Sequence, residues 1–238
     1  MNYRRVVIGF TVLISLYMFF WWVGNSTYIR MDDPKILLYM NGSSQMGYSS
    51  LLAYGTYYCL IYLAFLNFSI STESVIVLTR TNRKKFIHKY IGYIFIISLL
   101  FALVITIVNV VMTTLFLGYE YLIQERFYIA CMFSWVSLFF FYSIVGLVMK
   151  AMSDLTKSNL IGLVSSFFIV SIFYFVGRSF HNVWTPVKDL IMFEGVLSNV
   201  LSNLMIAIIY LKQLIIAIGL CIIVRIIFNE KDMLPNEN

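Results

Sequence analysis

Residues 90–118 read YIGYIFIISLLFALVITIVNVVMTTLFLG, an apolar run without a single charged side chain. A membrane-spanning helix needs roughly 20 apolar residues to cross a hydrocarbon core about 30 Å thick. This run is longer, so we expect a helix that crosses the membrane and either tilts or extends beyond it. The run therefore predicts an integral membrane protein.

Five further apolar runs bring the expected number of membrane-spanning helices to six. They lie at residues 6–23, 51–70, 127–149, 160–177 and 204–228. Of the 238 residues, 61% are apolar and 12% are charged, against about 25% charged in an average globular chain. We predict an all-α, polytopic membrane protein in which residues 1–238 form one transmembrane domain. The first run ends in the aromatic stretch Phe19–Trp22 and lacks a small-residue cleavage site, so we interpret it as a retained span.

The distribution of Lys and Arg predicts the orientation of these spans. With the N-terminus in the cytoplasm, the cytoplasmic segments carry eleven basic and five acidic residues, whereas the outer segments carry six of each. The net charge of +6 then lies entirely on the cytoplasmic side, in agreement with the positive-inside rule. We expect both termini in the cytoplasm. The charge forms no basic stripe on a soluble surface, so we expect no nucleic-acid partner.

Catalytic and metal-binding patterns are absent from the sequence. It has no Gly-Lys pair for a phosphate-binding loop, no HExxH and no GxSxG. Cys59, Cys131 and Cys221 lie apart within apolar runs, and the two histidines fall on opposite sides of the membrane, so we expect no disulfide framework and no metal site. The apolar runs hold almost no carboxylates, which argues against an ion-coupled carrier or an intramembrane enzyme. A transporter driven by a separate energy source remains compatible.

The connection between the second and third runs is strongly basic. Residues 71–89 read STESVIVLTRTNRKKFIHK. Ser71 and Thr72 are favourable N-cap residues, and Thr81-Asn82 interrupts the pattern, which predicts a short surface helix, a break, and then the helix of the third span. On local physics alone, this segment is interpreted as a positively charged anchor against anionic lipid headgroups.

The same segment resembles the first cytoplasmic loop of type-2 ABC exporter permeases. The resemblance is carried by Glu73, Leu78, Arg80, Arg83 and Lys89. It assigns these residues, together with Lys84 and Lys85, to an ATPase-coupling loop. In that family the loop forms a coupling helix that contacts a separate ATPase subunit, and six spans, cytoplasmic termini and a long outer segment between spans five and six are also typical. The resemblance implies that ATP and Mg are bound by the partner ATPase and that this chain itself binds no cofactor.

The outer segment between the fifth and sixth runs, residues 178–203, is expected to be structured. Thr185 is a natural N-cap and Pro186 suits the first helical position, which predicts a helix that begins there. Apolar residues recur at spacings of three and four from Leu190 to Leu204, which predicts an amphipathic helix at the outer surface leading into span six. Trp184 is expected to anchor it among the lipid headgroups.

Within this segment, Trp184, Pro186 and Asp189 match the signature of the WxPxxD family of bacterial membrane proteins. That family resembles small type-2 ABC permeases, found mainly in Gram-positive bacteria beside ATPase genes, often in peptide or bacteriocin settings. The resemblance implies a multi-pass protein of a Gram-positive cell membrane. On the residues alone, a purely structural role explains the motif: Trp184 anchors, Pro186 starts a helix and Asp189 stabilises its first turn.

Three polar residues within the apolar runs have two interpretations each. Lys212 and Gln213 lie near the outer end of the sixth run. Lys212 either extends to the membrane surface or, with Gln213, lines an exit path. Asn109 in the third run either forms an interhelical hydrogen bond or contacts a substrate.

Together these features favour a permease subunit of a type-2 ABC exporter, which is not itself an enzyme. Its cargo is expected to be a peptide, bacteriocin or lipid-like amphipathic substrate. Six spans are half of the usual twelve, so we expect pairing with a second copy or a sister permease, and two ATPase subunits beneath the 71–90 loops. A role in immunity, removing such a peptide from the membrane, fits equally. The alternative is a stand-alone membrane immunity or sensor protein that binds a toxin or partner without transport.

Overall fold

In a computed structural model, the described part of the chain comprises residues 3–31, 33, 35–42, 47–70, 83–180 and 182–230. Every regular element within it is a helix, which confirms the predicted all-α fold class. The elements are α1 (Tyr3–Asn25), α2 (Ile36–Asn41), η2 (Ala53–Tyr57), α3 (Tyr58–Ser69), α5 (Arg83–Leu117), α6 (Tyr119–Gln124), α7 (Phe127–Thr156), α8 (Asn159–Ser179), η3 (Lys188–Ile191), α9 (Met192–Leu197) and α10 (Asn203–Glu230).

Five of the described helices are long and apolar enough to cross a membrane, namely α1, α5, α7, α8 and α10. Their outward faces carry large apolar side chains; Phe19, Phe168 and Ile215, for example, are each 60% exposed. An apolar exterior of this kind is compatible with a multi-pass membrane protein, because lipid solvates what water would not. Helices α5 and α10 are each continuous, and α5 begins before, and α7 ends after, the apolar run that predicted it.

The second predicted span, residues 51–70, is helical but interrupted. Leu51 and Leu52 are α-helical, Ala53–Tyr57 form the π-helix η2, and Tyr58–Ser69 form α3. A π-turn places one extra residue in the helix and is frequent at functional sites. Because of this interruption, neither α3 nor η2 is among the five long helices.

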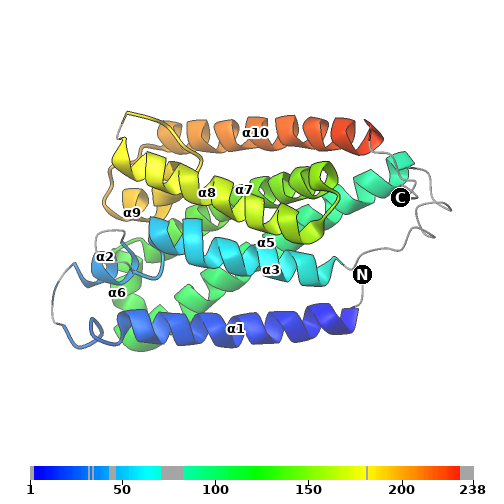
Figure 1. Ribbon diagram of the computed structural model, residues 1–238. Helices are drawn as coiled ribbons and strands as arrows, with labels where there is room; N and C mark the ends of the chain where they lie inside the picture. The colour runs from blue at the N-terminus through cyan, green and yellow to red at the C-terminus, as the bar shows by residue number, and fades with distance from the viewer. Residues whose placement is uncertain are drawn as a thin grey trace.

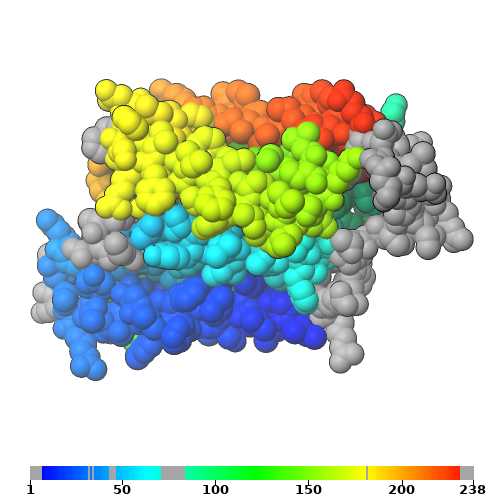
Figure 2. Space-filling view, viewed as in Figure 1, coloured from blue at the N-terminus to red at the C-terminus, as the bar shows by residue number. Residues whose placement is uncertain are grey.

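When the helical segment of residues 51–69 is counted with the five long helices, successive helices run in opposite directions along the chain (Figure 1). At one end of the bundle, here called the terminal end, α1 and α5 begin and α10 ends. At the opposite end, here called the loop end, lie the short helices α2, α6 and α9. In the space-filling view, α1, α3, α8 and α10 cover one face of the bundle as successive bands from blue to red (Figure 2).

Helix α7 lies at the centre of the bundle, where it packs against α5, α8 and α10. Of its most apolar stretch, 61% is buried, against 17% for α1 and for α10, which lie at the periphery. Helix α5 crosses the bundle obliquely (Figure 1). Near its start Phe86 stacks on Phe228 of α10, with ring centroids 5.6 Å apart, and near its end Phe116 stacks on Trp21 of α1, at 5.4 Å.

The core between α1, α3, α5 and α7 is rich in tyrosine. The rings of Tyr17 and Tyr58 lie about 5 Å apart, as do those of Tyr62 and Tyr142. The ring of Phe101 packs edge-on against Tyr17, Tyr62 and Tyr142. Burial of a hydroxyl requires a partner, and most of these tyrosines have one: the Tyr62 hydroxyl lies 2.7 Å from Ser98 Oγ, and the Tyr142 hydroxyl donates to the backbone oxygen of Tyr54 at 3.3 Å.

The polar connection between the first and second apolar runs, which has the composition of a surface segment, is partly packed into the loop end. Met40, Asn41 and Ser50 are each at most 1% exposed. Tyr48 donates its hydroxyl proton to the backbone oxygen of Ile105 in α5 at 3.1 Å, and Tyr58 donates to the backbone oxygen of Tyr48. Residues 40–42 and 47–50 of this connection therefore form part of the core.

The expected amphipathic helix through Leu204 is divided in the structure. Helix α9 ends at Leu197, and Asn199 adopts the left-handed conformation with φ 55°. The amides of Asn199 and Val200 bond back to the oxygens of Val196 and Gly195, which is the Schellman arrangement that terminates helices. The segment 178–203 thus contains two short helices and a turn before α10, because asparagine tolerates the left-handed conformation that a continuing helix excludes.

Candidate functional site

Trp184 and Asp189, which lie five residues apart, meet Lys212 of α10 at the loop end, and the three are here called the Trp184–Asp189–Lys212 site. Trp184 Nε1 donates to Asp189 Oδ1 at 3.1 Å. Lys212 Nζ, from α10, lies 3.5 Å from the same oxygen. The same ammonium lies 5.0 Å from the centroid of the Trp184 ring, within the range of a cation–π interaction. Trp184 and Asp189 of the segment before α9 and Lys212 of α10 are therefore parts of one site.

A second layer of hydrogen bonds ties this site to α7. Ser137 Oγ lies 3.3 Å from the backbone oxygen of Asp189, to which it can donate, and accepts a hydrogen bond from Gln213 Nε2 at 3.1 Å. Ser137 and Gln213 are both almost completely buried. Gln213 therefore faces the protein interior in this structure and positions the turn that carries Asp189.

Asp189 is a carboxylate in an unusual environment, since only 4% of the residue is exposed. Burial raises its pKa, while the hydrogen bond from Trp184 and the nearby charge of Lys212 act in the opposite direction. Asp189 Oδ1 receives both partners, whereas Oδ2 is buried and has no hydrogen-bond partner among the described residues. The carboxylate therefore has unused capacity to accept a hydrogen bond.

The turn that presents Asp189 is closed by Lys188. Its ammonium donates to the backbone oxygens of Phe180 at 2.9 Å and Val183 at 2.6 Å. The amide of Lys188 bonds to Thr185 O at 3.0 Å, and the 3₁₀-helix η3 begins at Lys188. The helix that was expected to begin at Pro186 therefore starts two residues later, as a tight turn. Trp184 is 43% exposed, so its insertion among lipid headgroups stays a prediction.

Asn109 lies in a buried polar network at the same end of the bundle. Its Nδ2 donates to Asn41 Oδ1 at 2.9 Å and to Ser49 Oγ at 3.3 Å, and its Oδ1 accepts from Trp21 Nε1 at 3.2 Å. Thr113 Oγ1 donates to the same oxygen at 3.2 Å. Asn109 is 3% exposed. The network joins α5 to α1 and to the connection between the first and second apolar runs.

The described part of the basic segment lies at the terminal end. Residues 71–82, and with them Glu73, Leu78 and Arg80, lie outside the described residues. Arg83 is the first residue of α5, and Lys84, Lys85 and Lys89 follow within its first two turns with exposed side chains. The ammonium of Lys89 lies 5.6 Å from the centroid of the Tyr93 ring. These lysines form a basic surface on an extension of the third span.

A buried ion pair without a strong signal in the sequence lies near the terminal end. Lys150 Nζ lies 2.8 Å from Asp154 Oδ1, and both residues are less than 10% exposed. The same ammonium lies 4.4 Å from the centroid of the Tyr90 ring in α5 and 5.0 Å from that of Phe228 in α10. The sequence signal was the spacing of four residues, but Lys150 and Asp154 were assigned to a loop because the apolar run ends at Met149.

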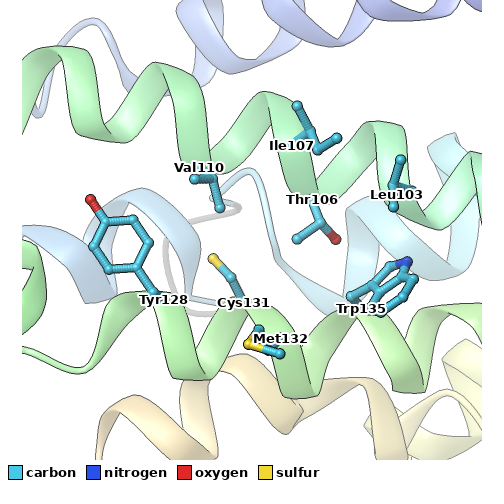
Figure 3. A pocket seen from close by; sticks show the side chains of 8 residues that line it. All are labelled: Leu103, Thr106, Ile107, Val110, Tyr128, Cys131, Met132 and Trp135. Carbon is cyan, nitrogen blue, oxygen red and sulfur yellow. The ribbon is translucent and has the colours of Figure 1, made fainter.

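A cavity of about 220 Å³ lies between α5 and α7 (Figure 3). Side chains from the two helices face each other across it, and Cys131 and Thr106 are among them. The polar atoms at its edge are largely bonded elsewhere: Thr106 Oγ1 donates to Ala102 O at 3.0 Å, and the hydroxyls of Tyr128 and Thr114 lie 3.1 Å apart. The cavity is therefore apolar and lies apart from the charged sites.

Within the described ranges, no three His, Cys, Asp or Glu side chains lie close enough together to hold a metal ion. The three cysteines are free thiols. Comparison with protein-family models, with curated proteins and with solved structures found no match for this chain.

Proposed function

We propose that the chain is the permease subunit of a type-2 ABC exporter, located in a bacterial cell membrane. Its cargo is a peptide, bacteriocin or lipid-like amphipathic molecule, moved out of the membrane or cell. The observation that carries the proposal is the alternating path of the helices, which brings the start of α1, the end of α10 and the basic start of α5 to one end of the bundle. A separate ATPase could act on all three from the cytoplasm.

The segment from Leu51 to Ser69 supplies the sixth span in this proposal. It leads from the loop end, where α1 finishes, to the terminal end, where α5 begins (Figure 1). Nineteen helical residues at about 1.5 Å each extend about 28 Å, close to the hydrocarbon thickness of a bilayer. Helix α3 contains no charged residue and packs against α1, α5, α7 and α8.

The terminal end faces the cytoplasm in this proposal. Lys84, Lys85, Lys89 and Lys157 are exposed there, and basic residues are retained on the cytoplasmic side of membranes. The loop end, with the Trp184–Asp189–Lys212 site, then faces outward. The cargo path lies between this chain and a second permease, because six spans provide half of the usual twelve.

The ATPase contact is tested by reversing charge at the start of α5. The double variant Lys84→Glu/Lys85→Glu is co-expressed with the ABC ATPase subunit that the proposal requires, and the complex is purified in mild detergent. We expect the variant to lose the ATPase, or to lose stimulation of ATP hydrolysis by this chain. Reversal of Glu73, Arg80 and Arg83 extends the test to the rest of the coupling segment.

Lys157→Glu is the matched control, because Lys157 is exposed at the same end of the bundle but lies in the α7–α8 turn. It changes the net charge in the same direction and is expected to retain the ATPase. If both variants retain it, or if no ATPase co-purifies with the wild-type chain, the exporter proposal is wrong. Toxin binding or protection without any ATPase would instead favour the stand-alone immunity or sensor protein.

A further inference from the structure

The Lys212 ammonium is held loosely at the loop end. Its distance of 3.5 Å to Asp189 Oδ1 exceeds the roughly 2.7–2.9 Å of a charge-assisted hydrogen bond. The Lys212 side chain is 39% exposed, while that of Asp189 is 5% exposed. By contrast, Lys150 and Asp154 lie 2.8 Å apart and are both buried. Lys212 therefore lies on the exposed side of the Asp189 carboxylate and does not satisfy all of its hydrogen-bonding capacity.

Asp189 has a free acceptor in this site. Its Oδ1 accepts from Trp184 Nε1, but its Oδ2 is buried without a hydrogen-bond partner among the described residues. A buried acceptor without a partner is destabilising, and an ammonium group, with three donors, could satisfy both oxygens. The ring of Trp184 adds a face that attracts a cation. The carboxylate and the ring thus form two walls of a cation site.

Exposed apolar side chains lie on the same loop as this pair. Phe180 is 60% exposed, Val183 is 44% exposed and Trp184 itself is 43% exposed. A ligand that reaches Asp189 with a charged group would lay an apolar body against these residues. The site therefore fits an amphipathic cation better than a small hydrated ion.

We propose that Trp184 and Asp189 form a binding site for a primary ammonium group on an apolar body, and that Lys212 occupies this site when no ligand is bound. As a contact for cargo, the site rests on the proposed export function and narrows the cargo to cationic amphipathic molecules. Binding itself requires no ATPase, so it is measurable in the isolated chain. An incoming ammonium replaces the ammonium of Lys212, which swings into solvent.

The test measures binding of n-octylammonium to the full chain in phosphatidylcholine nanodiscs by tryptophan fluorescence. The variant Lys212→Met removes the competing ammonium and leaves Asp189 and Trp184 in place. If the site is open about a tenth of the time in the wild type, the variant binds about tenfold more tightly. Asp189→Asn is expected to abolish binding, and Trp184→Leu is expected to remove the fluorescence response.

Two controls separate this site from general partitioning into lipid. n-Octanol has the same apolar body without the charge, and its signal is expected to be the same in all variants. Lys157→Met removes a lysine at the opposite end and is expected to leave octylammonium binding unchanged. If Asp189→Asn does not fold, Lys212→Met still tests the proposal. The proposal is wrong if Lys212→Met binds octylammonium no more tightly than the wild type does. It is also wrong if Lys212→Met responds to octanol as strongly as to octylammonium.

Two sources could provide such an ammonium, a lysine side chain of a peptide or the headgroup of an aminolipid. Phosphatidylethanolamine added to the nanodiscs competes with octylammonium in Lys212→Met if the lipid is the source. A lysine-containing amphipathic peptide competes if the source is a peptide. Competition by either supports the site. Loss of ATPase co-purification would leave these binding results unaffected, so the two proposals fail separately.

Discussion

At the residue scale, two buried carboxylates at opposite ends of the molecule are paired with lysines in different ways. Asp154 and Lys150 lie four residues apart on α7, with Tyr90 and Phe228 covering the ammonium. Asp189 and Lys212 come from different elements, and their lysine is partly exposed. The first pair joins three helices in a fixed packing, whereas the second can exchange its partner.

The buried Lys150–Asp154 pair is expected to be important for the stability of the fold. Replacing Lys150 with Met leaves Asp154 without its ammonium, and removal of one partner from a buried pair costs about 3–5 kcal/mol. We expect that loss in the free energy of unfolding, measured by denaturant titration in micelles. Lys157→Met, at an exposed site, should change stability by less than about 0.5 kcal/mol. Equal effects of the two substitutions would contradict this prediction.

Asp189 is expected to make stability depend on pH. Because burial raises its pKa in the folded chain, the fold binds this proton more tightly than the unfolded chain does. Its stabilising contribution is therefore fully present below the ordinary Asp pKa of about 3.9 and is lost as the pH rises through the higher folded value. The groups that act on this carboxylate are the charge of Lys212 in α10 and the hydrogen bond from Trp184 in the same turn, and both favour its ionised form.

The measurement is the free energy of unfolding of the wild type and of Asp189→Asn between pH 4 and neutrality. As the pH falls, the wild type should gain stability relative to the variant, which lacks this titration. Parallel pH profiles for the two proteins would show that Asp189 does not titrate in this window.

The individual residues of the Trp184–Asp189–Lys212 site could be identified in the sequence, but their association could not. Trp184 and Asp189 belong to one motif, and Lys212 and Gln213 stood out as polar residues in an apolar run. Their meeting depends on the fold-back of residues 182–189 onto α7 and α10, which local patterns do not encode. Lys150 and Asp154 were missed for the opposite reason, because hydropathy ends a span at the first charge even where the helix continues.

At the element scale, the close contact between α7 and α8 depends on a glycine, Gly162, which has no side chain. A Cβ placed on Gly162 of α8 would lie 2.7 Å from the Cα and the amide nitrogen of Ser153 in α7. Backbone atoms cannot move aside as a side chain can, so the two helices would have to separate. This close approach explains how α8 returns tightly along α7 after the short turn at Lys157.

We predict that Gly162→Ala destabilises the bundle by about 1–3 kcal/mol, as overpacking of a tight contact does. The matched control is Gly219→Ala in α10, where an added Cβ meets nothing within 4 Å. Alanine favours helix over glycine, so the control should be neutral or slightly stabilising. Thermal unfolding of both variants in the same detergent checks the prediction; a Gly162→Ala protein as stable as the control would refute it.

Element boundaries followed from the sequence where apolar runs ended in turns, and failed where a polar segment was buried. The runs predicted α1, α8 and α10 closely, because hydropathy changes sharply at their ends. The π-turn in the second run and the packing of Asn41 and Ser49 around Asn109 were not predictable. These features depend on partners from distant helices. The end of α9 had a local signal, Ser198-Asn199, which the apolar spacing of the segment masked.

At the scale of the whole molecule, the orientation of the bundle is open to direct measurement. Single cysteines at Lys84, Lys157, Met31 and Asn199, in a background with Cys59, Cys131 and Cys221 replaced by serine, report the two ends by reaction with an impermeant maleimide. We expect the first two positions to react only from the cytoplasmic side and the last two only from outside. If Lys84 and Met31 react from the same side, the segment 51–69 does not cross the membrane.

Helix α5 has a further mechanical consequence, because it joins opposite corners of the bundle. One of its ends is stacked on α10 at the terminal end and the other on α1 at the loop end. Thirty-five residues make a rod about 52 Å long. Helix α5 therefore links α1 and α10 as a rigid diagonal element. If α10 slides along α1, α5 must rotate or lose one of its stacking contacts. We therefore expect that a force on the basic start of α5 shifts α10 relative to α1.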